Sequence, residues 1–236
     1  MKLDIIIPVF NEDKRIVDLL QLLEKNIHCS FRILICYDSS TDKTLDHIKE
    51  KKVINNDLIL VKNPKTGPNS AILEGIKTSS AEILLVYMAD DFENIKLINA
   101  MIKLIDQGND LIIPSRFVEG GKMLGAVKIK ENVTKIGSYL IYFLARIPYK
   151  DCTNAFKMFS RKTKNLIEFR STTGFTFALE LVIKSFFLKL KIKEIPSTWS
   201  EIGNRKSNFK ILKWLPYYIY WLLYSILRNI FSYFYK

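Results

Sequence analysis

The sequence has few of the residues that stabilise small folds through metal ions or disulfides. It contains three cysteines, Cys29, Cys36 and Cys152, with no C-x-x-C spacing, and two histidines, His28 and His47. A structural zinc site needs about four such ligands at close spacing, so the sequence excludes one. Three scattered cysteines also exclude a disulfide framework, and they are typical of a protein that folds in a reducing compartment.

Glycine and proline are scarce as well, at 9 and 7 of 236 residues, which excludes collagen-like and linker-rich chains. The apolar run that precedes Pro8 is too short for a signal peptide, so we expect none. Apolar residues make up 48% of the chain and charged residues 25%, which predicts a packed core and excludes global disorder. The length fits one domain with a short appendage.

Acidic residues are missing from the end of the chain. Residues 1–110 carry 14 Lys and Arg against 17 Asp and Glu, whereas residues 111–236 carry 22 against 7. The net charge of residues 111–236, +15, therefore predicts a surface that faces phosphate, nucleic acid or lipid headgroups. No nucleic-acid-binding motif is present, so we expect no nucleic-acid partner.

Short apolar runs alternate with helical patterns along the first 115 residues. We expect strands at 3–9, 31–36, 57–61, 82–88 and 110–114, and helices at 13–26, 41–52, 69–78 and 95–107. Farther along, we expect a helix at 132–147, a strand at 154–159, a helix at 175–187 and a strand at 191–195. This alternation predicts an α/β fold, with a mostly parallel sheet covered by helices on both faces. Ligands of such sheets bind beyond the carboxyl ends of the strands.

The last segment, 209–236, differs from the rest because it holds 11 aromatic residues and no acid. Its longest charge-free run, 214–227, is shorter than the roughly 20 residues that a membrane span needs. Trp, Tyr, Lys and Arg are typical of membrane interfaces, so we expect helices that lie on a membrane surface. A helix pair docked on the domain or on a second subunit, and a full span over 212–234, are the alternatives. The helix at 132–147 fits either a membrane contact or an ordinary amphipathic core helix.

Five polar segments follow the expected strands, and the predicted topology places them along one edge of the sheet. Asp38, at a strand end, can accept hydrogen bonds from a base or a ribose. Asp90 and Asp91 are hard oxygen ligands suited to Mg²⁺ or Mn²⁺ together with substrate phosphate. Arg116 precedes Gly120–Gly121 and can bind a phosphate through two N–H groups. Each acid alone also fits a helix cap, but five such segments on one edge indicate a binding site.

In order, these segments resemble family 2 glycosyltransferases of the GT-A fold. They read I-I-P-V-F-N-E, D-S-S-T-D-K-T, G-P-N-S-A-I-L-E-G, M-A-D-D and S-R-F-V-E-G-G. Within that family the chain is most similar to the dolichol-phosphate mannosyltransferase-like, or polyprenyl-phosphate glycosyltransferase, group, over residues 3 to about 215. The resemblance implies a domain at 1–208 that transfers a sugar, with inversion, from a nucleotide-sugar donor to a polyprenyl phosphate. It also implies a cofactor, Mg²⁺ or Mn²⁺, and a place at the cytoplasmic face of a membrane.

The resemblance also implies roles for individual residues. The positions that match donor binding are Pro8, Phe10, Asn11, Glu12, Asp38, Ser39, Ala89, Asp90, Arg205 and Ser207. The positions that match metal binding are Asp90, Asp91 and Glu93, and those that match catalysis are Asp90, Asp91, Arg116 and Asp151. We predict that Arg116 binds a phosphate and does not form a structural ion pair.

Two departures from the family pattern keep other functions open. Met88 replaces the first acid of the usual Asp-x-Asp motif, and Ile202 replaces an arginine of the segment that closes over the donor. One alternative is therefore a catalytically silent protein that binds a nucleotide-sugar or acts as a scaffold. Another is transfer to a saccharide or protein hydroxyl, for which Asp151 is the candidate base. A homo-oligomer and a membrane-protein partner also stay open.

Overall fold

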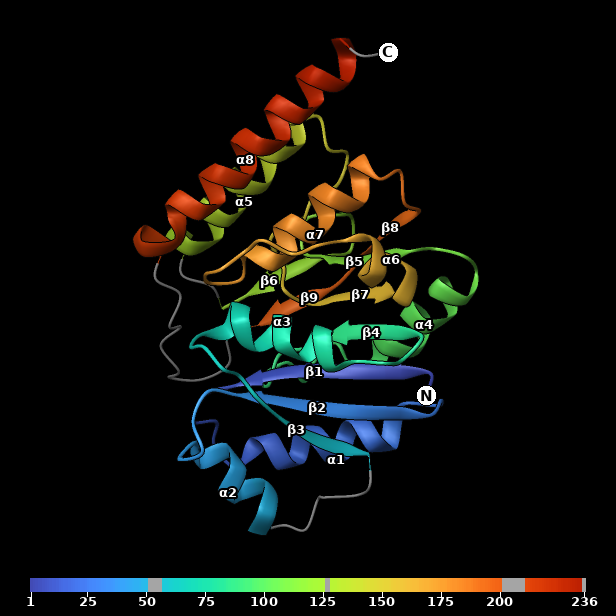
Figure 1. Cartoon of the computed structure of the whole chain (residues 1–236), viewed down its shortest axis with the longest axis vertical. Helices are drawn as coiled ribbons and strands as arrows, with labels where there is room; N and C mark the ends of the chain where they lie inside the picture. The colour runs from blue at the N-terminus through green and yellow to red at the C-terminus, as the bar shows by residue number, and fades with distance from the viewer. Residues whose placement is uncertain (51–56, 126–127, 201–210, 235–236) are drawn as a thin grey trace.

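Figure 1 shows the computed structural model of the protein, which describes residues 1–50, 57–125, 128–200 and 211–234. Its main sheet has seven strands in the order β3-β2-β1-β4-β7-β5-β8. The strands are β1 (Leu3–Val9), β2 (Phe31–Tyr37), β3 (Leu58–Lys62), β4 (Ile83–Val86), β5 (Leu111–Ser115), β7 (Lys157–Ser160) and β8 (Ile192–Pro196). Every pairing is parallel except those of β7, which runs antiparallel to β4 and β5. The predicted α/β fold with a mostly parallel sheet is confirmed.

Helices cover both faces of this sheet. They are α1 (Arg15–Asn26), α2 (Lys43–Glu50), α3 (Pro68–Thr78), η1 (Ile95–Leu97), α4 (Ile98–Asp106), α5 (Lys128–Leu144), α6 (Arg161–Leu166), α7 (Thr176–Phe187) and α8 (Ile211–Phe234). Side chains alternate between the two faces of a strand, so Ile5 and Ile7 pack with α1, α2 and α4, while Ile6 packs with α3 and α7. α3 approaches the sheet closely because residue 75 is glycine. A Cβ at Gly75 would lie 2.5 Å from Ile6 Cγ2 and 2.7 Å from Cys36 Sγ.

Three short elements were not predicted from the sequence. β6 (Lys122–Leu124) and β9 (Thr198–Ser200) pair in parallel to form a separate two-stranded sheet. α6 follows β7 directly, and its N-cap is Ser160, whose Oγ accepts a hydrogen bond from the Thr163 N–H at 3.2 Å. The expected strand at 154–159 is shorter than predicted, since β7 begins at Lys157.

The C-terminal segment forms one continuous helix, α8, beside α5 and α7 (Figure 1). Trp221 and Ser225 are buried in this contact. Asn229 Nδ2 donates to the Ala145 carbonyl at 2.7 Å, and Lys184 Nζ lies 5.5 Å from the Trp221 ring centroid. The segment therefore docks on the domain as a single helix, whereas the docking alternative expected a helix pair. Among the helices of the described residues, none combines the length and the apolar character that a bilayer crossing requires.

Candidate active site

The carboxyl ends of β1, β2, β4 and β5 lie on one edge of the sheet, because these strands run in the same direction. β1 and β2 end in register, with Pro8 opposite Cys36 and Val9 opposite Tyr37. β7 runs the other way, so its first residue, Lys157, lies at the same edge. The predicted segments therefore meet along this edge, with Pro8 at the end of the central strand.

The loop after β1 is tied to the beginning of α2. The Asn11 N–H donates to Asp42 Oδ1 at 3.0 Å, and the Glu12 N–H donates to Thr44 Oγ1 at 2.8 Å. Asn11 takes a left-handed conformation, with φ of 52°. These contacts hold the loop so that the side chain of Phe10 is 63% exposed. An exposed ring at the carboxyl edge offers a surface on which a nucleotide base can stack.

Asp38, after β2, is part of a hydrogen-bonded turn. Its Oδ1 accepts from Asn63 Nδ2 and its Oδ2 from the Gly67 N–H, both at 2.7 Å. Each carboxylate oxygen has a second lone pair, so Asp38 can still accept from a ligand. Ser39 is exposed, and its Oγ lies 2.8 Å from Thr41 Oγ1. The contacts of Asp38 also serve the fold, because they join the ends of β2 and β3 to the N-terminus of α3.

The residues after β4 differ in their environments. Ala89 is buried, whereas the acids Asp90 and Glu93 are exposed. Asp91 is partly buried and accepts hydrogen bonds from the Asn94 N–H at 3.1 Å and from Asn94 Nδ2 at 2.8 Å. Burial raises the pKa of Asp91 to about 6, although the hydrogen bonds from Asn94 oppose this shift. In the part of the chain that the structure describes, Asp90 has no hydrogen-bond or ion-pair partner, so its carboxylate is available to a ligand.

The three predicted metal ligands do not form a closed protein site. No group of three or more His, Cys, Asp or Glu side chains that could hold a metal occurs within residues 1–50, 57–125, 128–200 and 211–234. Asp91 is engaged by Asn94, which leaves Asp90 as the best-placed ligand. A divalent ion bound here would need phosphate oxygens and water to complete its coordination.

Asn94 was not identified from the sequence, and the structure gives it a central position. It is buried, its Nδ2 donates to the Thr198 carbonyl at 2.6 Å, and its Oδ1 accepts from the Thr198 N–H at 3.1 Å. Asn94 therefore joins the loop that carries Asp90 to β9. From sequence, an asparagine before a helix indicates only a cap. Arg205 and Ser207, both predicted to bind the donor, lie outside the described residues.

Arg116 forms a buried ion pair with Asp151. Its Nε donates to Asp151 Oδ2 and its Nη2 to Asp151 Oδ1, each at 2.7 Å, and Nη2 also donates to Thr153 Oγ1 at 3.1 Å. The Asp151 side chain is fully buried and that of Arg116 is 9% exposed. The prediction that Arg116 forms no structural ion pair is therefore wrong. The loop after it turns back tightly, since a Cβ at Gly121 would lie 2.5 Å from the Ser115 carbonyl oxygen.

Two further charged residues, the partly buried Glu194 and the buried Lys157, support this pair. Glu194 Oε1, on β8, accepts from the backbone N–H of Asp151 at 2.9 Å. Lys157 is completely buried and donates to the backbone carbonyls of Asn154 and Asp151. Burial lowers the pKa of Lys157 to about 8. Burial also raises the pKa of Asp151, but the charge and hydrogen bonds of Arg116 outweigh it and hold that pKa below its ordinary value. A buried carboxylate locked in this way is a poor general base.

Comparison with known proteins identifies the family. The model of "Glycosyl transferase family 2" matches residues 4–166, more than half of the chain. The chain belongs to glycosyl transferase family 2. The matched region runs from β1 to α6, so the family 2 segments after β1, β2, β4 and β5 all lie inside it, whereas α7, β8, β9 and α8 lie beyond it.

The chain is similar to curated proteins that are named for lipid-phosphate sugars. It is 25% identical over 213 residues to the dolichol-phosphate mannosyltransferase of Pyrococcus furiosus, covering 89% of this chain and 60% of that one. It is 26% identical over 228 residues to the dolichyl-phosphate beta-glucosyltransferase of Saccharomyces cerevisiae, covering 86% and 68%. It is 23% identical over 230 residues to the polyprenol monophosphomannose synthase of Mycolicibacterium smegmatis, covering 89% and 85%. This family 2 chain thus spans less than two thirds of the length of the Pyrococcus protein.

Solved structures confirm the fold of this family 2 member. The glucosyl-3-phosphoglycerate synthase of Mycobacterium tuberculosis, in complex with Mn²⁺, UDP and glucosyl-3-phosphoglycerate, superposes with a TM-score of 0.70 at 14% identity. The match covers 97% of this chain and 79% of that one. At this identity the likeness concerns the GT-A fold alone.

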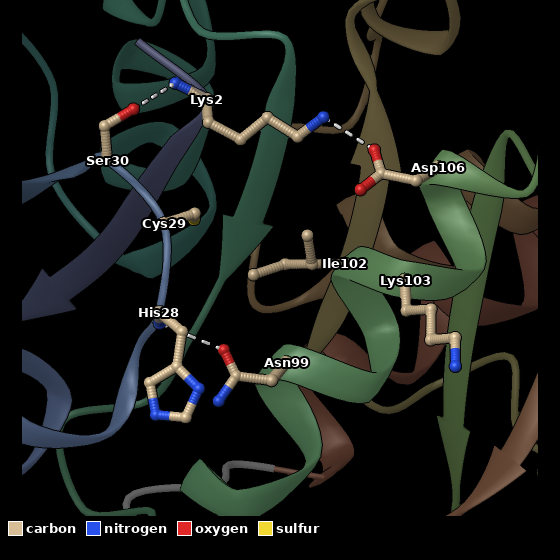
Figure 2. Close-up of a pocket in the computed structure, with 8 residues that line it drawn as sticks. All are labelled: Lys2, His28, Cys29, Ser30, Asn99, Ile102, Lys103 and Asp106. Carbon is tan, nitrogen blue, oxygen red and sulfur yellow. Dashed lines mark hydrogen bonds and ion pairs between the residues drawn. The ribbon is translucent and has the colours of Figure 1, made fainter.

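A pocket at the opposite edge of the sheet is not part of the family 2 site. It lies between the beginning of β1, the loop before β2 and α4 (Figure 2). Lys2 Nζ crosses it to Asp106 Oδ1 at 2.6 Å, and the His28 N–H donates to Asn99 Oδ1 at 3.2 Å. None of the predicted site residues lines this pocket.

Proposed function

We propose that this protein is an inverting glycosyltransferase that moves a sugar from a nucleotide-sugar donor to the phosphate of a polyprenyl lipid, at the cytoplasmic face of a membrane. The observation that carries the proposal is the conjunction of the family 2 segments on one sheet edge with an apolar two-helix surface beside it. The names of the Pyrococcus, Saccharomyces and Mycolicibacterium relatives support the lipid-phosphate acceptor.

The donor occupies the carboxyl edge of β1, β2 and β4. Phe10 stacks on the base, Asp38 accepts from the base or the ribose, and Asp90 lies at the diphosphate. The carboxylate of Asp90 is a hard oxygen ligand of the kind that Mg²⁺ and Mn²⁺ prefer, whereas the Met88 thioether is a soft one. Mg²⁺ needs only one or two protein carboxylates when phosphate oxygens and water complete its shell, so this edge fits a divalent ion. When bound, the ion neutralises the charge that develops on the departing diphosphate.

Arg116 binds the acceptor phosphate from within its ion pair. Asp151 and Thr153 engage Nε and Nη2 of the guanidinium, and Nη1 has no partner among the described residues. A guanidinium held at one side by a buried carboxylate is fixed in orientation, so it positions the phosphate behind the sugar carbon. A lipid phosphate is already an anion at neutral pH, and transfer to it does not need the general base that Asp151 fails to provide.

The membrane contact is made by the outward faces of α5 and α8, which lie side by side at one end of the molecule (Figure 1). These faces expose apolar and aromatic side chains between 41% and 66%: Ile136, Tyr139, Leu140, Phe143 and Leu144 on α5, and Leu215, Tyr217, Ile219, Tyr220, Leu223, Leu227, Ile230 and Phe231 on α8. An exposed apolar surface of this extent marks an interaction site. Burial raises the pKa of Tyr218 on α8, and the charge of Arg116 opposes that shift.

The test is acceptor discrimination with a panel of radiolabelled nucleotide-sugars. We expect label to enter the organic phase with polyprenyl phosphate, and not with the corresponding polyprenol, which lacks the phosphate. Label that moves to a soluble saccharide or a peptide would favour the hydroxyl-acceptor alternative. Binding of nucleotide without any transfer would favour the silent scaffold.

A further inference from the structure

A second pocket lies on the flank of α8, away from the carboxyl edge. It is enclosed by α8, the second half of α7 and the segment that follows α6, and its volume is about 280 Å³. Liquid water occupies roughly 30 Å³ per molecule, so the pocket has room for a phosphate group. None of the residues proposed for donor, metal or acceptor binding lines it.

The pocket is basic and aromatic. Its lining includes three cations, Arg170, Lys184 and Arg228, and three aromatic side chains, Tyr220, Trp221 and Tyr224. Glu168 is the one acid among its lining residues. Together with Glu180, whose carboxylate contacts Lys184 from behind the lining, these groups leave a net charge of +1, which favours an anionic ligand.

Two of the cations are held in place before any ligand arrives. Lys184 Nζ contacts Glu180 Oε1 at 2.5 Å, and its side chain is 14% exposed. The Arg228 guanidinium donates from Nη1 to the Tyr224 hydroxyl at 2.6 Å and lies 5.2 Å from the Phe187 ring centroid. An ammonium has three donors and a guanidinium five, so both keep donors for a phosphate.

The third cation is more open. The Arg170 side chain is 68% exposed, and its Nη2 lies 3.6 Å from Glu168 Oε2, a weak surface pair that a phosphate can replace. Arg170 therefore completes the set of three cations that line the pocket.

The pocket continues into the apolar face of α8. Tyr220 and Tyr224 line the pocket, and Leu223, Leu227 and Phe231 are exposed farther around the helix and along it. A phosphate in the pocket can thus be attached to chains that lie on this face, where aromatic side chains mark the headgroup level of a bilayer. A free phosphate would use the polar half alone.

We propose that this pocket binds the phosphate of an anionic phospholipid headgroup and so orients α8 on the membrane. The inference rests on the membrane-facing surface of the proposed function. Because the lining is net positive, it selects lipids with net negative headgroups over zwitterionic ones.

The experiment compares binding to vesicles of phosphatidylcholine alone with binding to vesicles that also contain phosphatidylglycerol. The wild-type protein should prefer the anionic vesicles. Arg170→Gln/Arg228→Gln should reduce that preference about 30-fold, because each basic residue near an anionic surface contributes roughly a factor of five. Arg170→Lys/Arg228→Lys keeps the charge and should retain most of the preference for anionic vesicles. Thermal melting establishes that each variant is folded.

A matched control removes two charges at the far end of the molecule. Arg15 and Lys25 lie on α1, at the end opposite α8 (Figure 1). Arg15→Gln/Lys25→Gln should leave the vesicle preference within twofold of wild type. An equal loss in this control would show a general charge effect and overturn the pocket assignment, as would an unchanged preference in Arg170→Gln/Arg228→Gln.

Two further arms separate the ligand source and the proposed function. If inorganic phosphate binds the pocket in solution and removes the vesicle preference, the pocket takes free anions and the lipid assignment is wrong. Transfer to polyprenyl phosphate is measured in a neutral detergent, where Arg170→Gln/Arg228→Gln should equal wild type. If the wild-type protein transfers sugar in detergent but shows no preference for anionic vesicles, the lipid assignment of the pocket is refuted and the proposed function is not. Absence of transfer by the wild type would refute the proposed function, whatever the vesicles show.

Discussion

The buried pair between Arg116 and Asp151 determines the structure at the proposed acceptor end of the site. Three donors of Arg116, the backbone N–H, Nε and Nη2, point at one carboxylate. Glu194 and Lys157 hold the segment around that carboxylate from β8 and β7. The guanidinium therefore has one orientation available, which suits a group that must position a phosphate.

Removing either partner leaves an unpaired buried charge. We expect Arg116→Gln and Asp151→Asn each to lower the free energy of unfolding by about 3–5 kcal/mol. The double variant should cost less than the sum of the two, because the partners are coupled. Urea denaturation of the four proteins measures this cycle. The exposed pair of Arg15 with Asp13 provides the control, since Arg15→Gln should cost less than about 1 kcal/mol. Additive single effects at Arg116 and Asp151 would show that the pair is not the structural unit described here.

The burial of Lys157 makes the free energy of unfolding depend on pH above about pH 8. Burial lowers the pKa of Lys157 from 10.5 to about 8 in the folded protein. Between these values the unfolded chain binds the proton and the folded protein does not, so this group makes the protein more stable as pH rises from about 8 to 10.5.

Lys157→Met lacks this contribution. We expect the free energy of unfolding of the wild type, minus that of Lys157→Met, to increase across this pH range. Chemical denaturation at several pH values measures the difference, and Lys162→Met, at an exposed position, should show no such trend. A difference that stays constant with pH would mean that Lys157 is not buried as the structure describes.

At the scale of elements, α8 has one face that packs on the domain and one face that we propose contacts a membrane. Trp221 and Ser225 face α7 and α5, while Leu223 and Leu227 face outward. Truncation before α8 would therefore remove the proposed membrane contact and also expose the helices on which α8 docks. Substitutions on the outward face separate the two roles.

Leu223→Gln/Leu227→Gln should weaken membrane binding without unfolding the protein. Each leucine that leaves water contributes up to about 2 kcal/mol, so we expect binding to uncharged vesicles to fall by at least about tenfold. Flotation with phosphatidylcholine vesicles measures this effect. Leu22 on α1 and Leu60 on β3 are exposed leucines elsewhere, and Leu22→Gln/Leu60→Gln should bind as the wild type does. Equal binding of all three proteins would show that the outward face of α8 does not contact the membrane.

Much of the fold could be predicted from the sequence because its longer elements have clear periodicity. The run Leu3–Val9 is almost wholly apolar, and Leu19, Leu20 and Leu23 recur at helical spacing. β6 and β9 could not be predicted, because strands of three residues show no periodicity. Their pairing depends on segments that are distant in the sequence.

The site residues that come directly after a strand could be predicted from the sequence. The exposed Asp90 after β4 and the exposed Phe10 after β1 lie where the topology places them. The Arg116–Asp151 pair and the contact of Asn94 with Thr198 join residues that are 35 and 104 positions apart. A single sequence shows the residue types in these pairs but not that they meet.

At the scale of the whole molecule, the charge asymmetry coincides with the architecture. Residues 1–110, which carry net negative charge, form β1–β4 and α1–α4, and the basic residues 111–236 include α5, α7 and α8 at the other end (Figure 1). The +15 half is thus the half that carries the exposed apolar helices. A basic, apolar end suits an anionic membrane surface, and the carboxyl edge with Asp90 lies between the two halves.

The central claim is that this chain carries out metal-assisted transfer to a lipid phosphate although Met88 replaces the first acid of the family motif. The most direct measurement is the initial rate at which label from a nucleotide-sugar enters the organic phase with polyprenyl phosphate and Mg²⁺ or Mn²⁺. The account predicts that the wild type transfers the sugar. The initial rate should fall about 100-fold or more in EDTA and in Asp90→Asn, because charge stabilisation at the leaving group is of that order. The rate should fall less in Asp91→Asn. Full activity in EDTA or in folded Asp90→Asn would contradict the metal-assisted mechanism. Absence of transfer by the wild type with every donor and acceptor would contradict the account as a whole.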